Sequence, residues 1–166
     1  MGGGAGASDP PSQQPPAAGE ATKPFQVDRA LQALGFQFTR VTAREVAGRL
    51  PPFDLLNGGV SALMAEVTAS IGCYVASGYR RLAGVQLSIN HVGPARLGDL
   101  VQATATPIQL GRKIQVWEVQ IWRIDPSTSE CKDLVSTARV TLLANQSTPP
   151  EMKSFEEGLK KFSSKL

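Results

Sequence analysis

The chain has few of the residues on which metal and redox sites depend. It contains one histidine, His91, and two cysteines, Cys73 and Cys131, among 166 residues. This pair of cysteines matches no zinc or thioredoxin-type spacing, and a single histidine supplies neither a proton relay nor a metal ligand set. No Gly-x-Ser-x-Gly nucleophile elbow occurs either. We therefore expect no metal and no cofactor, and we expect Cys73 to be a small core residue in a reducing compartment.

Strong net charge is also missing. Seventeen basic residues stand against fourteen acidic ones, which gives a formal charge of +3. This excess is small, and no basic stripe is interleaved with aromatic residues, so we expect no nucleic-acid partner. It can still help to attract an anionic ligand such as a CoA ester. No uninterrupted apolar run reaches the roughly 18 residues that a membrane span needs, so we expect no membrane association.

Composition divides the chain into three parts. Residues 1–24 are mostly Gly, Pro, Ala and Gln, and such a segment cannot bury enough surface to offset the entropy lost on ordering. We predict a disordered tail there. A globular domain is predicted over residues 25–144, followed over 145–166 by a polar linker and a short amphipathic helix at 151–162.

Hydrophobic periodicity within the domain predicts an α+β fold with one long helix. Val60, Met64, Val67 and Ile71 recur at helical spacing within residues 58–77, a segment so poor in charge that burial nearly all round is expected. A shorter helix is predicted over 28–34, ending at Gly35. Strands are predicted over 36–50, with a possible turn near Thr42, and over 82–92, 99–109, 113–124 and 134–143. The expected sheet is a five-stranded antiparallel meander. One helix cannot cover both faces of it, and its edges need partners, so we expect an oligomer.

Glu66 is the main candidate for chemistry. It lies in the nearly charge-free helix, where burial of an unpaired carboxylate raises its pKa towards neutrality and suits it to act as a general base. The alternative is a structural glutamate that is capped by a backbone donor or faces solvent. Ser70 follows at i+4, on the same helix face. It either shares the site or is a small packing residue.

Gly58 and Gly59 begin the predicted helix. Its free N–H groups and positive dipole end can stabilise an oxyanion, although a flexible turn is the simpler interpretation. Gly58 and Glu66 are eight residues apart, roughly 12 Å along a helix. One carbonyl cannot contact both within a subunit, so if both act on one substrate, they belong to different subunits.

Two further features allow two interpretations each. His91, just before a Gly-Pro turn, is either a satisfied structural histidine or a contact to bound ligand. Arg112 and Lys113 at a turn can bind phosphate or can simply be solvated.

The last three residues, Ser164, Lys165 and Leu166, have the pattern of a C-terminal address that the peroxisomal import receptor reads. We expect a peroxisomal protein. The alternative is a basic tail helix that happens to end in these residues.

Three stretches, 58–66, 83–91 and 111–119, together resemble the hotdog-fold thioesterases, and among them the plant peroxisomal 1,4-dihydroxy-2-naphthoyl-CoA thioesterases. The resemblance runs from about residue 25 to 143 and returns at the terminal address. It implies a hotdog fold, in which a curved antiparallel sheet wraps around one central helix and two subunits join into a longer sheet. A homodimer or homotetramer is therefore expected.

The resemblance also implies roles for residues. The family's catalytic acid falls on Glu66, its helix serine on Ser70 and its oxyanion N–H on Gly58. The segments that contact CoA fall on Gly84, on His91, Val92, Gly93 and Pro94, and on Leu110, Gly111, Arg112 and Lys113.

The segment before the long helix departs from the family pattern Gln-Pro-Phe-x-x-Leu-His-Gly-Gly. Residues 51–59 read Pro-Pro-Phe-Asp-Leu-Leu-Asn-Gly-Gly, so the glutamine is absent and Asn57 replaces the histidine. The connection at residues 50–52 is also several residues shorter than usual. Asn57 can still donate a hydrogen bond from its amide, but it cannot become cationic.

The resulting hypothesis is an acyl-CoA thioesterase acting on an aromatic acyl-CoA, with 1,4-dihydroxy-2-naphthoyl-CoA of phylloquinone (vitamin K1) biosynthesis as the expected substrate. Glu66 would act as general base or as nucleophile. Two alternatives stay open: a peroxisomal acyl-CoA thioesterase of broad specificity, and a non-catalytic CoA-ester-binding homologue that has lost the family's glutamine and histidine.

Overall fold

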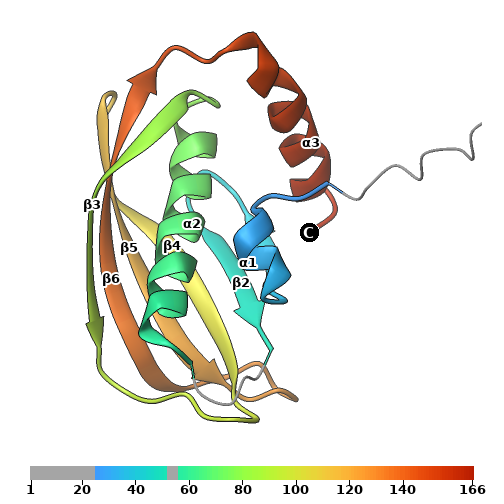
Figure 1. Ribbon diagram of the computed structural model, residues 1–166, viewed down its shortest axis with the longest axis vertical. Coiled ribbons are helices and arrows are strands. Elements are labelled where there is room, and N and C mark those ends of the chain that lie inside the picture. Colours follow the sequence, from blue (N-terminus) through green and yellow to red (C-terminus); the bar gives the residue numbers. More distant parts are fainter. Residues whose placement is uncertain (1–24, 52–55) are drawn as a thin grey trace, which may run out of the picture.

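The computed structural model describes residues 25–51 and 56–166 (Figure 1). The predicted disordered tail at 1–24 lies outside the described residues, as do residues 52–55 of the segment before the long helix.

The first described element is the short helix α1, Arg29–Ala33. Asp28 caps it, because its Oδ1 accepts a hydrogen bond from the Leu31 N–H at 2.7 Å. The helix ends before Gly35, whose φ of +87° is a left-handed conformation that glycine adopts readily. The prediction of a helix at 28–34 is confirmed.

Residues 36–50 form two strands, β1 (Gln37–Val41) and β2 (Val46–Leu50), joined in a hairpin. Thr42 closes the turn: its N–H donates to the Glu45 carbonyl at 2.9 Å, and its Oγ1 accepts from the Glu45 N–H. The expected turn near Thr42 is therefore present, and it divides the predicted single strand into two.

The sheet has six antiparallel strands rather than five, in the order β1-β2-β4-β5-β6-β3. The remaining strands are β3 (Arg81–His91), β4 (Leu100–Leu110), β5 (Ile114–Ile124) and β6 (Cys131–Gln146). The predicted meander is wrong for β3, which pairs with β6 at the far edge while β4 pairs with β2. The helix between β2 and β3 carries the chain across the sheet, so neighbours in sequence are not neighbours in the sheet.

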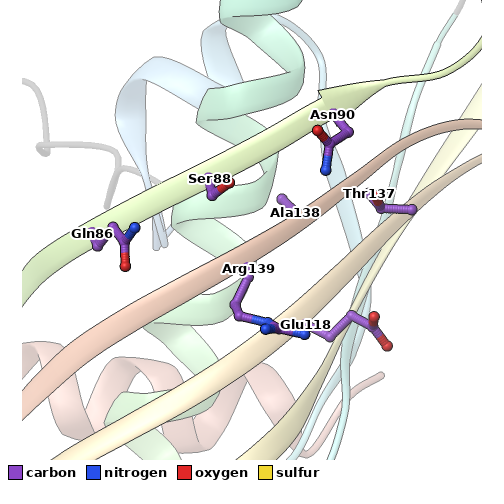
Figure 2. Close-up of a pocket in the computed structure, with 7 residues that line it drawn as sticks. All are labelled: Gln86, Ser88, Asn90, Glu118, Thr137, Ala138 and Arg139. Carbon is purple, nitrogen blue, oxygen red and sulfur yellow. The ribbon is translucent and has the colours of Figure 1, made fainter.

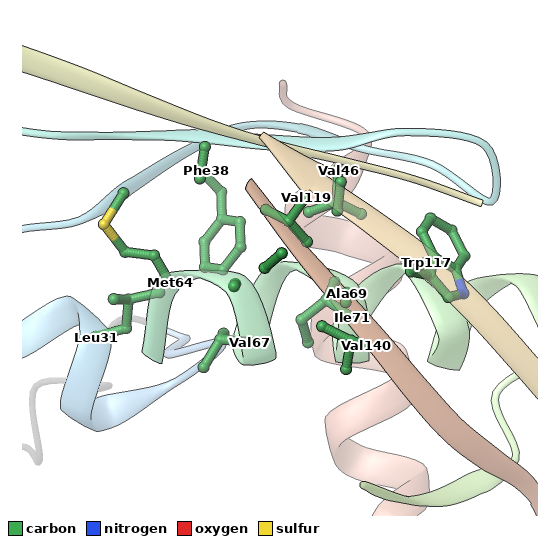
Figure 3. Packing of buried hydrophobic residues seen from close by; sticks show 14 of the residues in the cluster. Leu31, Phe38, Val46, Met64, Val67, Ala69, Ile71, Trp117, Val119 and Val140 are labelled. Atoms are coloured by element: carbon green, nitrogen blue, oxygen red, sulfur yellow. The ribbon is translucent and has the colours of Figure 1, made fainter. Parts of the chain in front are cut away.

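The long helix α2, Gly58–Ala76, lies along one face of the curved sheet, with α1 and α3 towards the β1–β2 side (Figure 1). Its buried side chains pack with those of the sheet, including Trp117, Val119 and Val140 (Figure 3). Contact with the sheet is close at Gly72, where an added Cβ would lie 2.6 Å from the Trp117 ring. Cys73 is fully buried as expected, and burial raises the pKa of its thiol to about 12.

Two expectations for α2 need correction. Contrary to the sequence-based expectation, the helix is long and apolar enough to span a membrane, with a mean hydropathy of 1.4, but 56% of that stretch is buried inside the protein. The apolar side chains of α2 therefore form part of the protein core. Burial is also not complete all round, because Glu66 and Ser70 are only half-buried. The sheet covers one side of α2, and the described part of a single subunit leaves the other side partly open.

The C-terminal helix α3, Lys153–Ser163, follows a 3-10 turn at Pro150–Met152. Leu159 is fully buried, and Phe155 and Phe162 contact Phe25 with ring centroids 5.4 and 6.2 Å apart. The predicted helix at 151–162 is confirmed, while the predicted linker at 145–150 is shorter because β6 continues to Gln146.

Candidate active site

Glu66 projects from α2 towards β3. A Cβ placed on Gly84 would lie 2.7 Å from Glu66 Oε1, so the carboxylate occupies space that only a glycine leaves open. Burial raises the pKa of Glu66 above its ordinary value. Among the described residues no donor is hydrogen-bonded to this carboxylate, which argues against a capped structural glutamate. The group has the properties of a general base.

Ser70 lies one turn further along α2 on the same half-buried face. The nearby Thr68 hydroxyl, by contrast, bonds the helix backbone, because it donates to the Met64 carbonyl at 2.7 Å. Ser70 has no such intrahelical bond in the described structure, so it can contact a bound molecule beside Glu66.

Asn57 is the N-cap of α2. Its side-chain Oδ1 accepts a hydrogen bond from the Gly59 N–H at 2.8 Å. The Gly58 N–H has no acceptor within the described ranges, and Gly58 is exposed. The helix therefore begins with one N–H occupied by its own cap and another that is open to a ligand. Sequence reasoning missed this capping role, although asparagine is among the preferred N-cap residues.

His91, at the end of β3, lies beside Gly58. Its Nδ1 is 3.1 Å from Ser136 Oγ, and a Cβ on Gly58 would lie 3.0 Å from its Nε2. The two interpretations of His91 are thus compatible: one ring nitrogen is anchored to a fully buried serine, and the other faces the open helix end. Sequence reasoning missed Ser136, because only strand pairing brings residues 91 and 136 together.

The structure thus forms two half-sites along β3. Glu66 and Ser70 lie beside Gly84 near the start of the strand, and Gly58 lies beside His91 at its end. The helix rise puts Gly58 and Glu66 roughly 12 Å apart. One chain does not bring Glu66 and Gly58 together.

The remaining predicted contacts fall into two groups. Val92, Gly93 and Pro94 line a surface cavity of about 530 Å³ that continues from the His91 end. Leu110, Gly111, Arg112 and Lys113 form the β4–β5 turn, two strands across the sheet from the start of β3. No described contact joins this turn to Glu66.

A second cavity, of about 410 Å³, lies over β3, β5 and β6 (Figure 2). On β6, Thr137 and Arg139 of its lining alternate with the buried Ala138 and Val140, so their side chains point away from α2. Glu118 and Arg139 are opposite each other there. This polar cavity contains neither Glu66 nor Gly58 and is separate from the candidate site.

Comparison with known proteins bears on the family of this chain. A family model described as the thioesterase superfamily matches residues 53–130. The chain is 45% identical over 150 residues to 1,4-dihydroxy-2-naphthoyl-CoA thioesterase 2 of Arabidopsis thaliana, covering 86% of this chain and 96% of that protein. It is 37% identical over 92 residues to a 1,4-dihydroxy-2-naphthoyl-CoA hydrolase of Listeria monocytogenes, covering 55% of this chain and 69% of that protein.

Among solved structures, the chain is similar to a thioesterase from Haemophilus influenzae, with a TM-score of 0.56 and 30% identity over 69% of this chain and 80% of that one. The expected hotdog fold is confirmed.

Proposed function

Because the chain belongs to the thioesterase superfamily, we propose that it hydrolyses the thioester of 1,4-dihydroxy-2-naphthoyl-CoA in phylloquinone biosynthesis. The observation that carries this proposal is Glu66 of the central helix, a carboxylate of raised pKa that lies beside Gly84 and has no hydrogen-bond donor among the described residues. The acyl group is inferred from the plant and Listeria relatives, whose names specify that substrate.

The chemistry follows from the two half-sites. Glu66 accepts a proton from water, the hydroxide adds to the thioester carbonyl, and the Gly58 N–H stabilises the oxyanion. Collapse of the tetrahedral intermediate breaks the carbon–sulfur bond, and the proton held by Glu66 passes to the departing CoA thiolate. In the second route Glu66 attacks the carbonyl directly and water hydrolyses the mixed anhydride. Ser70 lies where it can position the water or the acyl group.

A complete site requires two subunits. Strand β3 is the edge of the sheet, and most of its residues are exposed. Antiparallel pairing of two β3 strands about an axis between Leu87 and Ser88 would place Gly84 opposite the partner's His91. Glu66 would then approach the open helix end of the partner subunit. We therefore include a homodimer, or a tetramer built from such dimers, in the proposal.

Asn57 bears on the non-catalytic alternative. Its bond to Gly59 occupies a donor at the helix end that would otherwise be available to an oxyanion. A chain that binds CoA esters without cleaving them is the second candidate function, and this bond is the observation in its favour.

A panel of acyl-CoAs tests the proposal. Release of CoA thiol should be fastest with the dihydroxynaphthoyl ester. Equal rates on aliphatic and aromatic esters would favour broad specificity. Tight binding of every ester without thiol release would favour the non-catalytic alternative.

Peroxisomal localisation is part of the same proposal. The tripeptide Ser164–Leu166 follows α3, and Lys165 and Leu166 are exposed to a receptor. A fluorescent fusion that ends in Leu166 should enter peroxisomes, and one that lacks Leu166 should stay in the cytosol. Import of the truncated fusion would contradict the proposal.

A further inference from the structure

Ser136 carries a fully buried hydroxyl that faces the α2 side of the sheet. It lies on β6, opposite His91 of β3 and opposite Ile121 of β5. Its Oγ is 3.1 Å from His91 Nδ1, and within the described ranges no other group is hydrogen-bonded to it. Its neighbours across to β5 and along β6, Ile121 and Ala138, are apolar and buried. The imidazole of His91 is therefore the polar group that satisfies this hydroxyl.

The direction of the bond between Ser136 and His91 follows from the hydrogen on each group. A neutral imidazole has one N–H and one acceptor nitrogen, and the bond made by one nitrogen sets the tautomer. If Nδ1 of His91 carried the hydrogen, Ser136 Oγ would accept it, and the serine's own hydrogen would have no acceptor among the described residues. Such an unmade bond is costly in a protein interior. If the hydroxyl donates to Nδ1 instead, both groups are satisfied and the ring hydrogen lies on Nε2.

Nε2 of His91 is the ring atom nearest to the start of α2. A Cβ built on Gly58 would lie 3.0 Å from Nε2, 3.3 Å from Cε1 and 3.7 Å from Cδ2. Both residues are exposed, and neither Nε2 nor the Gly58 N–H is hydrogen-bonded to another described residue. With its hydrogen on Nε2, the imidazole adds a second free donor next to the backbone donor at the helix end.

We propose that Ser136 is a positioning residue that holds His91 in the tautomer with its hydrogen on Nε2, so that this N–H and the Gly58 N–H bind the thioester oxyanion together. A donor from β3 then offsets the Gly59 N–H that Asn57 occupies. The resemblance to the thioesterases places His91 in a segment that contacts CoA, and it assigns no role to Ser136. The role of Ser136 rests on the proposed function, since the oxyanion is that of the same thioester.

Nitrogen NMR of the imidazole tests the tautomer directly. His91 is the only histidine of the chain, so the full-length protein without a histidine tag gives the signals of one ring. With the ring titrated to its neutral form, the wild type should show a protonated Nε2 and an unprotonated Nδ1. Ser136→Ala should show a mixture of the two tautomers.

The matched control for the NMR measurement is Thr137→Val, which removes the neighbouring β6 hydroxyl on the other face of the sheet. Its imidazole signals should match those of the wild type. A wild-type ring with its hydrogen on Nδ1 would overturn the inference, whether or not the protein cleaves thioesters. An unchanged tautomer in Ser136→Ala would overturn it as well.

Kinetics measure what the tautomer contributes to hydrolysis. Loss of one oxyanion donor reduces kcat by roughly 10²–10³. Ser136→Ala keeps the imidazole but frees its orientation, so we expect kcat to fall about tenfold with KM little changed. Ser136→Thr keeps the hydroxyl and should retain most of the wild-type kcat, and Thr137→Val should retain all of it.

A double-mutant cycle separates positioning from a packing contribution of Ser136. Once His91→Ala has removed the ring, Ser136→Ala should cause no further decrease in kcat, because the bond that it breaks is already absent. Urea unfolding confirms that each variant is folded. An equal decrease in kcat with and without the imidazole would show that Ser136 acts through packing and would overturn the inference. If none of these proteins, the wild type included, releases CoA thiol, the proposed function fails, and the NMR signals alone decide whether Ser136 sets the tautomer.

Discussion

The two ends of β3 differ in how their polar groups are satisfied. Near its start Glu66 lies beside Gly84 without a described donor. At its end His91 is bonded to Ser136, and the adjacent helix N-terminus is partly occupied by Asn57. The first region contains a group that can accept a proton, and the second contains donors that can hold an oxyanion. Each chain thus has both halves of the proposed hydrolytic site, separated along one strand, and the proposed dimer would combine them.

The largest effect is expected from Glu66→Gln. The amide keeps the shape of the side chain but cannot accept a proton, and general-base assistance is worth roughly 10²–10⁴ in rate. Turnover should fall at least about a hundredfold, while CoA-ester binding measured by titration stays close to that of the wild type. Glu118→Gln, in the polar cavity on the other face of the sheet, is the control and should leave turnover unchanged. Normal turnover in folded Glu66→Gln would show that another group performs the chemistry.

A smaller loss is expected from Gly84→Ala. The new methyl would lie 2.7 Å from Glu66 Oε1, so the carboxylate must move. A misplacement of about 1 Å can reduce the rate by up to about a hundredfold, and we expect a decrease in kcat of about tenfold because the side chain can adjust. Ser88→Ala, at a position of the same strand that faces away from α2, is the control. Equal kcat in Gly84→Ala and wild type would mean that Glu66 does not act from its observed position.

The pH dependence of kcat/KM and of stability should show the titration of Glu66. Burial raises the pKa of Glu66 above its ordinary value of 4.5. Because the base must be ionised, kcat/KM should fall as pH decreases through a value above 4.5.

The folded protein also binds this proton more tightly than the unfolded chain, so the contribution of Glu66 to stability should decrease as pH rises from 4.5 through the raised pKa. Rate profiles and urea unfolding over this range measure both effects, and Glu66→Gln should show neither. An acidic limb at or below 4.5 in the wild-type profile would contradict this assignment.

The smallest change in rate is expected from Asn57→His, at the half-site that contains Gly58. Asn57→His should raise turnover severalfold, because the bond to Gly59 is lost and a stronger donor is added near Gly58. Loss of the N-cap should also lower stability by about 1 kcal/mol. Asn57→Ala loses the cap without adding a donor, so a comparison of kcat and urea midpoint separates the two effects. A large fall in turnover in Asn57→His would identify Asn57 as an adapted catalytic residue.

Local patterns predicted the elements better than their arrangement. The bounds of α2 follow from its apolar periodicity and from Asn57 at its start, and the strands follow from β-prone runs between turns. The place of β3 at the far edge could not be predicted in this way, since it depends on α2 crossing the sheet. The proximity of Gly84 to Glu66 and of Ser136 to His91 has the same origin, because both are contacts between residues distant in sequence. The N-cap bond of Asn57 is local and could have been predicted from its residue type.

Complementation between two inactive subunits tests the composite site most directly. Glu66→Gln lacks the base, and Gly58→Val fills the space in front of His91 Nε2, where an added Cβ would already lie 3.0 Å away. Each variant alone should have little activity. In a dimer of one of each, the intact Glu66 faces the intact Gly58 of the other subunit, and one of the two sites works. Random mixing in a two-fold dimer should therefore restore about a quarter of wild-type thioester hydrolysis. No recovery, in a mixture shown to contain mixed dimers, would contradict a site shared between subunits.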